Sequence, residues 1–265
     1  MENVTYLDYC LKNNTLMRWP DSCMPLTVYI APFQWYKAKG SDVYTYKQMV
    51  MDAFDLWSKA TGGKVSFRIV STLHESQINI SWKRVDRKAL GMCYFNYDKQ
   101  NRLYSAEVEI GLSDGILHAK YQDQNEVMHT IVHEIGHALG LQHSPYKNDI
   151  MYVPHQFGVY NVTQRDKDTL KWMYSLPYGM PVSEMAALYS MPGVTSVDQI
   201  VRNLLSRSTS EFEHVKSDVQ AQRPSRDLLQ EQDMLANMNL YNFTVQNVNL
   251  SQDVKKYLDD LRRKS

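Results

Sequence analysis

The stretch HEIGHALGLQH places histidines at spacings that suit a metal ion. His133 and His137 are four residues apart, so on a helix both imidazoles project from one face, at a separation that a tetrahedral zinc can bridge. Gly140 can adopt a backbone conformation that reverses the chain, which would bring His143 back as a third ligand. Three neutral nitrogens leave a fourth zinc position open to water, and Glu134 could take the proton of that water. The pattern therefore predicts a hydrolytic metal site.

The specificity of this pattern lies in its length. The short form HExxH is weak on its own, whereas the added glycine and third histidine make a chance occurrence about a thousandfold rarer. Other interpretations remain open. The stretch could be a helix with histidines on a polar face, a zinc site that has lost its activity, or a zinc-organised binding module whose helical tail carries the interaction.

With its downstream methionine, the motif resembles that of the metzincin metalloproteases, HExxHxxGxxH followed by a Met-turn. The candidate methionine is Met151 in NDIMYVP. In that family it packs beneath the three imidazoles without touching the metal. Ser144, after the third histidine, and Tyr152, after Met151, are similar to the matrixins, and the chain resembles the smaller microbial members. The Tyr that serves as an extra ligand in other metzincins is replaced by Val153, so the resemblance implies no fifth protein ligand.

The resemblance covers residues 24–178 and implies an α+β fold. The expected metzincin catalytic domain has a mixed, mostly parallel twisted sheet, an active-site helix and a C-terminal helix, followed here by a helical C-terminal extension. Two further stretches are similar to matrixins, AFDLWSKATGGKVSFRIV and VTQRDKDTLKWMYSLP. The first matches the passage from the first helix into the second strand, and the second matches the last helix of the catalytic domain.

The activity that the resemblance implies is hydrolysis of peptide bonds by a zinc-bound water with Glu134 as general base. The substrate would be a protein or peptide bound in extended form along an edge strand, expected at Ala89–Tyr94, with Ala89, Leu90 and Gly91 in contact. The pocket beside the zinc would be walled by YVPHQFGVYNV. This wall begins with Tyr152, Val153 and Pro154, and its apolar content predicts an apolar residue just after the cut.

Several differences from animal matrixins limit the metal ions that we expect this chain to bind. No histidine lies between Trp82 and His118, so we expect one catalytic zinc and no second zinc. Calcium stays open through Asp114, Asp123 or Glu126, although solvated carboxylates are the commoner reading. The latency segment PRCGxPD is absent. His129 and His155 fit an ordinary surface or supporting role better than a catalytic one.

Periodicity indicates the elements that would carry this site. Apolar residues recur every three to four positions over 44–61 and again over 125–139, which predicts two helices. Short alternating or apolar runs predict strands at 26–31, 65–70, 77–82, 89–95 and 105–112. The order of one strand, a helix, four strands and a helix suggests a mixed sheet with helices laid on it.

A change in amino-acid composition along the chain predicts the domain organisation. All five Trp and ten of the eleven Gly lie before residue 180, while the rest is polar and helical in pattern. We therefore expect an N-terminal segment (1–23), a catalytic domain (24–178) and an α-helical extension (179–265), with helices at 196–208, 225–239 and 251–264. The extension is either docked on the first domain or a partner-binding module.

Charge and cysteine usage exclude some partners and leave others open. Lys plus Arg and Asp plus Glu each total 29 in 265 residues, so we expect no nucleic-acid partner, and no apolar run is long enough to span a membrane. Cys10 and Cys23 could form a disulfide or remain free thiols. We expect a monomer that is exported and whose signal peptide is missing from this chain, with a cytoplasmic peptidase as the alternative.

Overall fold

The computed structural model describes residues 4–33, 40–85, 90–113 and 123–215. The chain divides into a compact unit, Met1–Arg202, and a second unit, Asn203–Ser265. The helices predicted at 225–239 and 251–264 lie outside the described residues. The first unit holds the predicted site.

A five-stranded sheet forms the centre of the first unit, in the order β4-β3-β5-β7-β6. Every neighbouring pair is parallel except β6 and β7, which are antiparallel. The predicted mixed, mostly parallel sheet is therefore confirmed, and β6 lies at one edge of it. The strands are β3 (Leu26–Ile30), β4 (Phe67–Val70), β5 (Ile78–Arg84), β6 (Gly91–Tyr97) and β7 (Leu103–Leu112).

Strand alternation separates the two faces of the sheet. In β5, Ile78 and Ile80 point to the same side as Val108 and Ile110 of β7, and all four are buried. The opposite side carries polar side chains, including the ion pair between Lys83 Nζ and Glu109 at 2.7 Å. The apolar face is the one that must be covered by helices.

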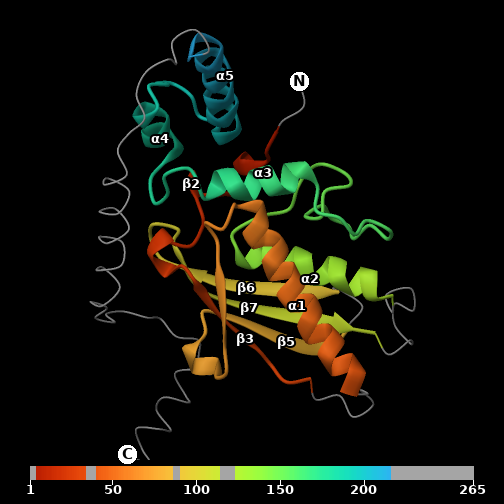
Figure 1. Ribbon diagram of the computed structural model, residues 1–265. Coiled ribbons are helices and arrows are strands. Elements are labelled where there is room, and N and C mark those ends of the chain that lie inside the picture. The colour runs from red at the N-terminus through yellow and green to blue at the C-terminus, as the bar shows by residue number, and fades with distance from the viewer. Residues whose placement is uncertain (1–3, 34–39, 86–89, 114–122, 216–265) are drawn as a thin grey trace, which may run out of the picture. The chain divides into compact units, whose positions relative to one another are not determined.

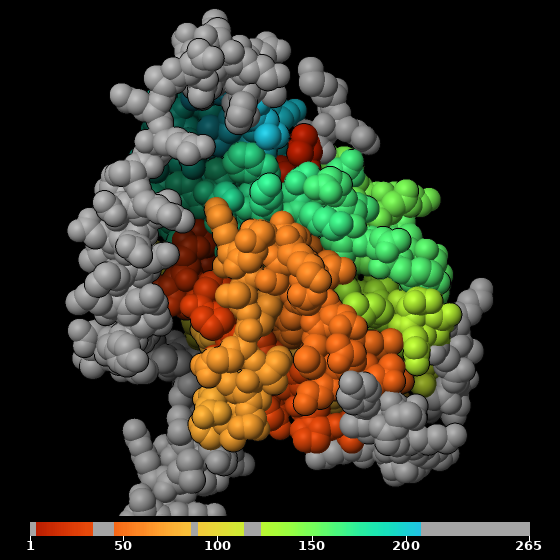
Figure 2. Space-filling model, viewed as in Figure 1, coloured from red at the N-terminus to blue at the C-terminus, as the bar shows by residue number. Residues whose placement is uncertain are grey.

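Two long helices cover that face. The described residues form the α-helices α1 (Gly40–Ala60), α2 (Gln124–Ala138), α3 (Gln164–Met173), α4 (Val182–Leu188) and α5 (Val197–Val215). The helix α1 lies across the sheet beside α2 (Figure 1), and its Trp57 indole donates to the Val132 carbonyl of α2 at 3.1 Å. In the space-filling view, atoms of α1 lie in front of the middle of the sheet (Figure 2). The α+β fold is thus confirmed.

Several boundaries differ from those predicted. The helix α1 begins at Gly40 rather than at residue 44, and β6 begins at Gly91 rather than at Ala89, which lies outside the described residues. The short helix α4 was not predicted. The short elements are the 3-10 turns η1 (Leu7–Cys10), η2 (Asp21–Cys23) and η3 (Leu73–Glu75), and a hairpin of β1 (Leu11–Lys12) and β2 (Thr15–Leu16).

The N-terminal segment belongs to the same compact unit as the sheet. Its backbone at Leu7 donates to the Asp198 carboxylate at 2.8 Å, and Asp8 in return accepts from Val197 N at 2.6 Å. Trp19 is fully buried and donates to the Ala138 carbonyl at 2.8 Å. The compact unit thus includes the N-terminal segment and runs as far as Arg202.

Two further findings concern the cysteines and the helices. Cys10, Cys23 and Cys93 are all free thiols, so the disulfide alternative for Cys10 and Cys23 is not realised. Among the described residues, the helices are too short or too polar for a transmembrane segment.

Candidate metal and active site

The helix α2 carries the predicted site residues and is defined at both ends. The Asp123 side chain accepts from Asn125 N at 2.7 Å and caps the first turn. Most of the helix is buried, including His133 and Glu134 at 9% and 7% exposure. Polar groups in such an environment need partners or a function.

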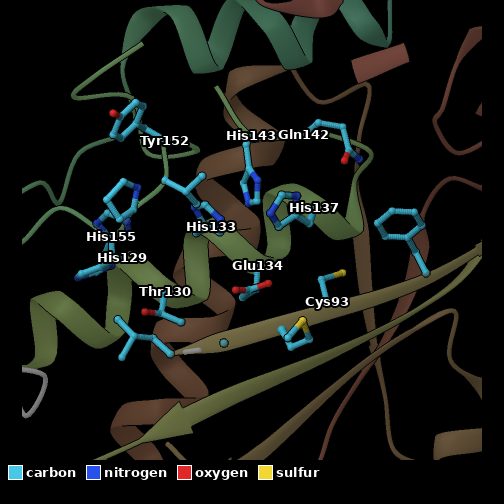
Figure 3. Close-up of a pocket in the computed structure, with 16 residues that line it drawn as sticks. Cys93, His129, Thr130, His133, Glu134, His137, Gln142, His143, Tyr152 and His155 are labelled. Carbon is cyan, nitrogen blue, oxygen red and sulfur yellow. The ribbon is translucent and has the colours of Figure 1, made fainter. Parts of the chain in front are cut away.

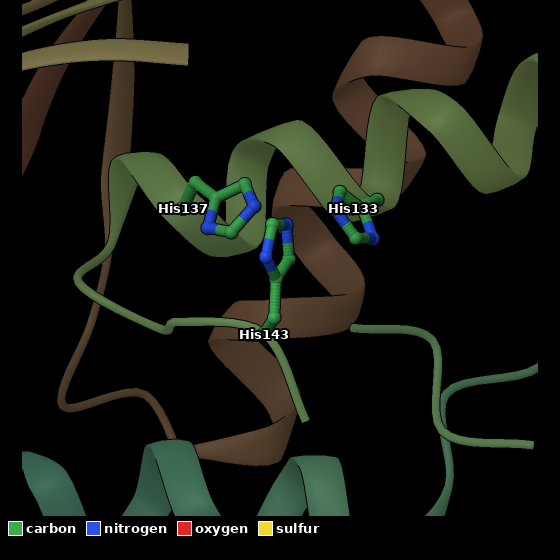
Figure 4. A group of neighbouring side chains, drawn as sticks. All are labelled: His133, His137 and His143. Carbon is green, nitrogen blue, oxygen red and sulfur yellow. The ribbon is translucent and has the colours of Figure 1, made fainter. Parts of the chain in front are cut away.

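A glycine ends α2 and returns the chain towards its own helix. Gly140 has a φ of +105°, and a Cβ there would collide with the Met17 carbonyl oxygen. Leu141 N then donates to the Gly136 carbonyl at 3.0 Å, closing the turn. This turn directs His143 back over the helix, as Figure 4 shows.

The three histidines converge on one point. Their ligand nitrogens all lie within 4.8 Å of one another, the one such group among the described residues. His133 Nδ1 lies 2.8 Å from the Ile150 carbonyl, and His137 Nδ1 lies 2.8 Å from the Leu141 carbonyl. A carbonyl can only accept, so both Nδ1 atoms donate and both Nε2 atoms are left for a metal.

Burial sets the charge of these groups. It lowers the pKa of His133 well below its usual value and that of His137 to about 4, so both imidazoles are neutral at pH 7, the form that binds metal. Burial raises the pKa of Glu134 to about 8, against the opposing effect of Lys83. A cation held by the imidazoles would lower the pKa of Glu134 again.

Met151 packs against α2, the helix that carries His133 and His137. It is fully buried, and a Cβ built on Gly136 would come within 2.5 Å of its sulfur. The preceding backbone is fixed, since Ile150 N donates to Asp166 at 2.9 Å and Ser144 Oγ donates to Asp149 at 2.6 Å. Gly136 thus leaves room for the thioether between the turns that carry His133 and His137.

The three histidines and Glu134 line a cavity of about 580 Å³. Leu90 and Gly91 line it from the sheet edge, and Tyr152, Val153 and Pro154 line it from the opposite side. The structure therefore brings together every predicted substrate-contact residue except Ala89, which lies outside the described residues. Figure 3 shows Glu134 on α2 facing the strand that carries Cys93.

His129 and His155, for which the sequence favoured a surface or supporting role, also line this cavity, with ring centroids 4.2 Å apart. Cys93, for which the sequence predicted no role, lines it from β6. Burial and the neighbouring His155 lower the pKa of His129 to about 4. His129 precedes His133 by one turn, and Cys93 follows Gly91 by two strand positions, so helical and strand spacing could have placed both.

The carboxylates considered for calcium have other partners. Asp123 caps α2, and Glu126 is buried and hydrogen-bonded to groups of the 155–160 segment. Asp114 lies outside the described residues. The described carboxylates therefore give calcium no support.

Comparisons with known proteins agree with this geometry. A family model described as matrixin matches residues 26–175. A protein of Trichoplusia ni ascovirus 2c, named a matrix metalloproteinase, is 27% identical over 129 residues, covering 42% of this chain and 25% of the relative. The matrix metalloproteinase 095L of Invertebrate iridescent virus 3 is 37% identical over 65 residues, covering 24% of this chain and 17% of the relative. The chain thus matches a quarter or less of the length of these curated relatives.

Proposed function

Because the chain belongs to the matrixin family, we propose that it is a zinc-dependent endopeptidase with Glu134 as its general base. The observation that carries the proposal is the convergence of three imidazole nitrogens within 4.8 Å beside a buried carboxylate in one cavity. A structural zinc site would use its fourth position for a protein ligand, whereas the described residues supply three.

His133, His137 and His143 would hold the zinc. The donor set fits, because burial keeps His133 and His137 neutral and backbone carbonyls fix which nitrogen of each faces the cavity. When bound, zinc would supply Lewis acidity, lowering the pKa of a water and polarising the carbonyl of the bond to be cut.

Glu134 would move the proton. Its carboxylate faces the same cavity and is flanked by β6, so it can accept a proton from the attacking water and pass it to the leaving nitrogen. No acyl-enzyme is needed, since water attacks the carbonyl directly.

The sheet edge would hold the substrate. Within the described part of the chain, β6 is an edge strand that pairs with β7, so an extended peptide could pair with its other side through backbone hydrogen bonds. Selectivity would come from the cavity, where Tyr152, Val153 and Pro154 favour an apolar residue after the cut.

The test is cleavage of a diverse peptide library by the zinc-loaded protein, read by mass spectrometry. We expect cuts before apolar residues, loss of all cuts with a chelator, and recovery with zinc. Glu134→Gln should lower kcat by about a hundredfold or more while zinc content stays at one per chain. The matched control is Glu75→Gln on η3, an exposed glutamate outside the cavity. A zinc-loaded protein that cuts nothing, or a Glu134→Gln variant as active as the parent, would refute the proposal and favour a binding module.

A further inference from the structure

The segment Tyr152–Tyr160, called the wall loop below, forms one side of the cavity and is hydrogen-bonded to α2. Its first four residues line the cavity, and the rest run along the N-terminal half of α2. The wall loop has no helix or strand of its own, so its position depends on contacts with the rest of the molecule.

Glu126 on α2 makes three hydrogen-bond contacts with the wall loop. Its carboxylate lies 2.7 Å from His155 Nε2, accepts from Gly158 N at 3.0 Å, and accepts from the Tyr160 hydroxyl at 3.1 Å. One turn further along α2, His129 Nδ1 lies 2.6 Å from the Val159 carbonyl. Four wall-loop residues are thus tied to one face of α2.

The energetics favour a single position for the wall loop. Glu126 is 4% exposed, so its hydrogen bonds to the wall loop are largely shielded from competition by water. Hydrogen bonds to a charged acceptor are also about twice as strong as neutral ones. The bond to Glu126 raises the pKa of Tyr160, which keeps the hydroxyl protonated as a donor.

We propose that Glu126 is a positioning residue that fixes the wall loop against α2 and thereby sets the selectivity for the residue after the cut. Glu126 does not line the cavity and acts through His155 and the backbone behind it. This role rests on the proposed function, because the wall loop selects substrate side chains only if peptides are cut here. Releasing the wall loop would let the cavity accept side chains of more varied size and polarity.

Three variants separate this role from a general loss of structure. Glu126→Ala removes every contact of the carboxylate. Glu126→Gln keeps an oxygen that can accept from Gly158 N and the Tyr160 hydroxyl, and should rescue most of the effect. Tyr160→Phe removes one bond through an exposed side chain that is outside the cavity. Glu75→Gln on η3 serves as the matched control.

The experiment measures kcat and KM of the zinc-loaded proteins on peptides that differ only in the residue after the cut, and amide exchange at Gly158 without substrate. For Glu126→Ala we expect KM for the best peptide to rise about tenfold, kcat to stay within about threefold, the spread between best and worst peptides to shrink at least about fivefold, and Gly158 to exchange about tenfold faster. Tyr160→Phe should move each quantity in the same direction by about two- to threefold.

The experiment distinguishes a failure of the role proposed for Glu126 from a failure of the proposed function. A wild-type protein that cuts nothing refutes the proposed function. A wild-type protein that cuts, with Glu126→Ala retaining its selectivity and its Gly158 exchange rate, overturns the role of Glu126 alone. If Glu126→Ala does not fold, Tyr160→Phe decides, and a Tyr160→Phe protein with unchanged selectivity and an unchanged Gly158 exchange rate overturns the role.

Discussion

Gly91 is the position where a single methyl group should disable the proposed general base. A Cβ at Gly91 would lie 2.6 Å from Glu134 Cγ, 2.8 Å from Glu134 Oε1 and 2.7 Å from Thr130 Cγ2. Carbon atoms in contact prefer about 3.5–4.0 Å, so the carboxylate or the strand must move by about 1 Å. Because Thr130 blocks a second direction, Gly91→Ala should displace Glu134 from its place in the cavity.

The expected magnitude follows from that displacement. Misplacing a reacting group by about 1 Å costs about a hundredfold in rate, or about 2.7 kcal/mol of transition-state stabilisation. Gly91→Ala should therefore lower kcat by about a hundredfold, while its zinc content stays at one per chain. Overpacking should cost about 1–3 kcal/mol of folding free energy, so thermal unfolding is recorded beside the kinetics.

A double-mutant cycle makes the Gly91 test strict. If Gly91→Ala acts through Glu134, adding Glu134→Gln should cost far less in the Gly91→Ala background than in the parent. Asn96→Ala on the same strand, whose exposed side chain is outside the cavity, should leave kcat unchanged. A folded Gly91→Ala protein with kcat within threefold of the parent, or additive effects in the cycle, would refute this account of the site.

Three other predictions follow from buried groups. His129 is 1% exposed and has a pKa of about 4, so between pH 6.5 and 4 its imidazole is protonated in the unfolded chain but not in the folded one, and the metal-free protein should lose about 3 kcal/mol of stability from this group. Urea unfolding at pH 7 and 5 should show a smaller loss of stability for His129→Asn than for the parent. An equal loss in both proteins would contradict this prediction. Gly136→Ala should clash with Met151 and cost about 1–3 kcal/mol, measured by thermal unfolding and restored in part by Met151→Ala. A chain ending at residue 178 should melt well below the full chain, because it loses the buried Asp198 that binds the N-terminal backbone; equal melting temperatures would show that residues 179–202 are dispensable.

The parts of the site that sequence predicted are those coded by local spacing. The interval of four between His133 and His137 defines one helical face, and Gly140 at φ +105° makes the turn that its place in the motif predicted. Strand alternation likewise located β5 and β7, whose apolar positions recur every second residue. In each case the signal lies within about ten residues of what it positions.

The parts that sequence did not predict depend on contacts between distant segments. Nothing near Glu126 indicates that its carboxylate will meet Gly158, 32 residues away, and a glutamate early in a helix usually remains solvated. The contact between His155 and Glu126 was likewise not predicted, because the two residues are distant in the sequence. The strand β6 could be predicted only approximately, because its start is fixed by pairing of Gly91 with Ile110 of β7.

The N-terminal segment is hydrogen-bonded to the residues that position the histidines. The Tyr6 hydroxyl donates to Asp166 at 2.9 Å, and the other oxygen of that carboxylate accepts from Ile150 N, whose own carbonyl orients His133. Cys10 accepts from Gln142 N, next to His143, at 3.4 Å. Because buried hydrogen bonds link His133 to Tyr6, and one further hydrogen bond holds the residue before His143 to Cys10, the placement of these histidines depends on residues that lie more than a hundred positions before them.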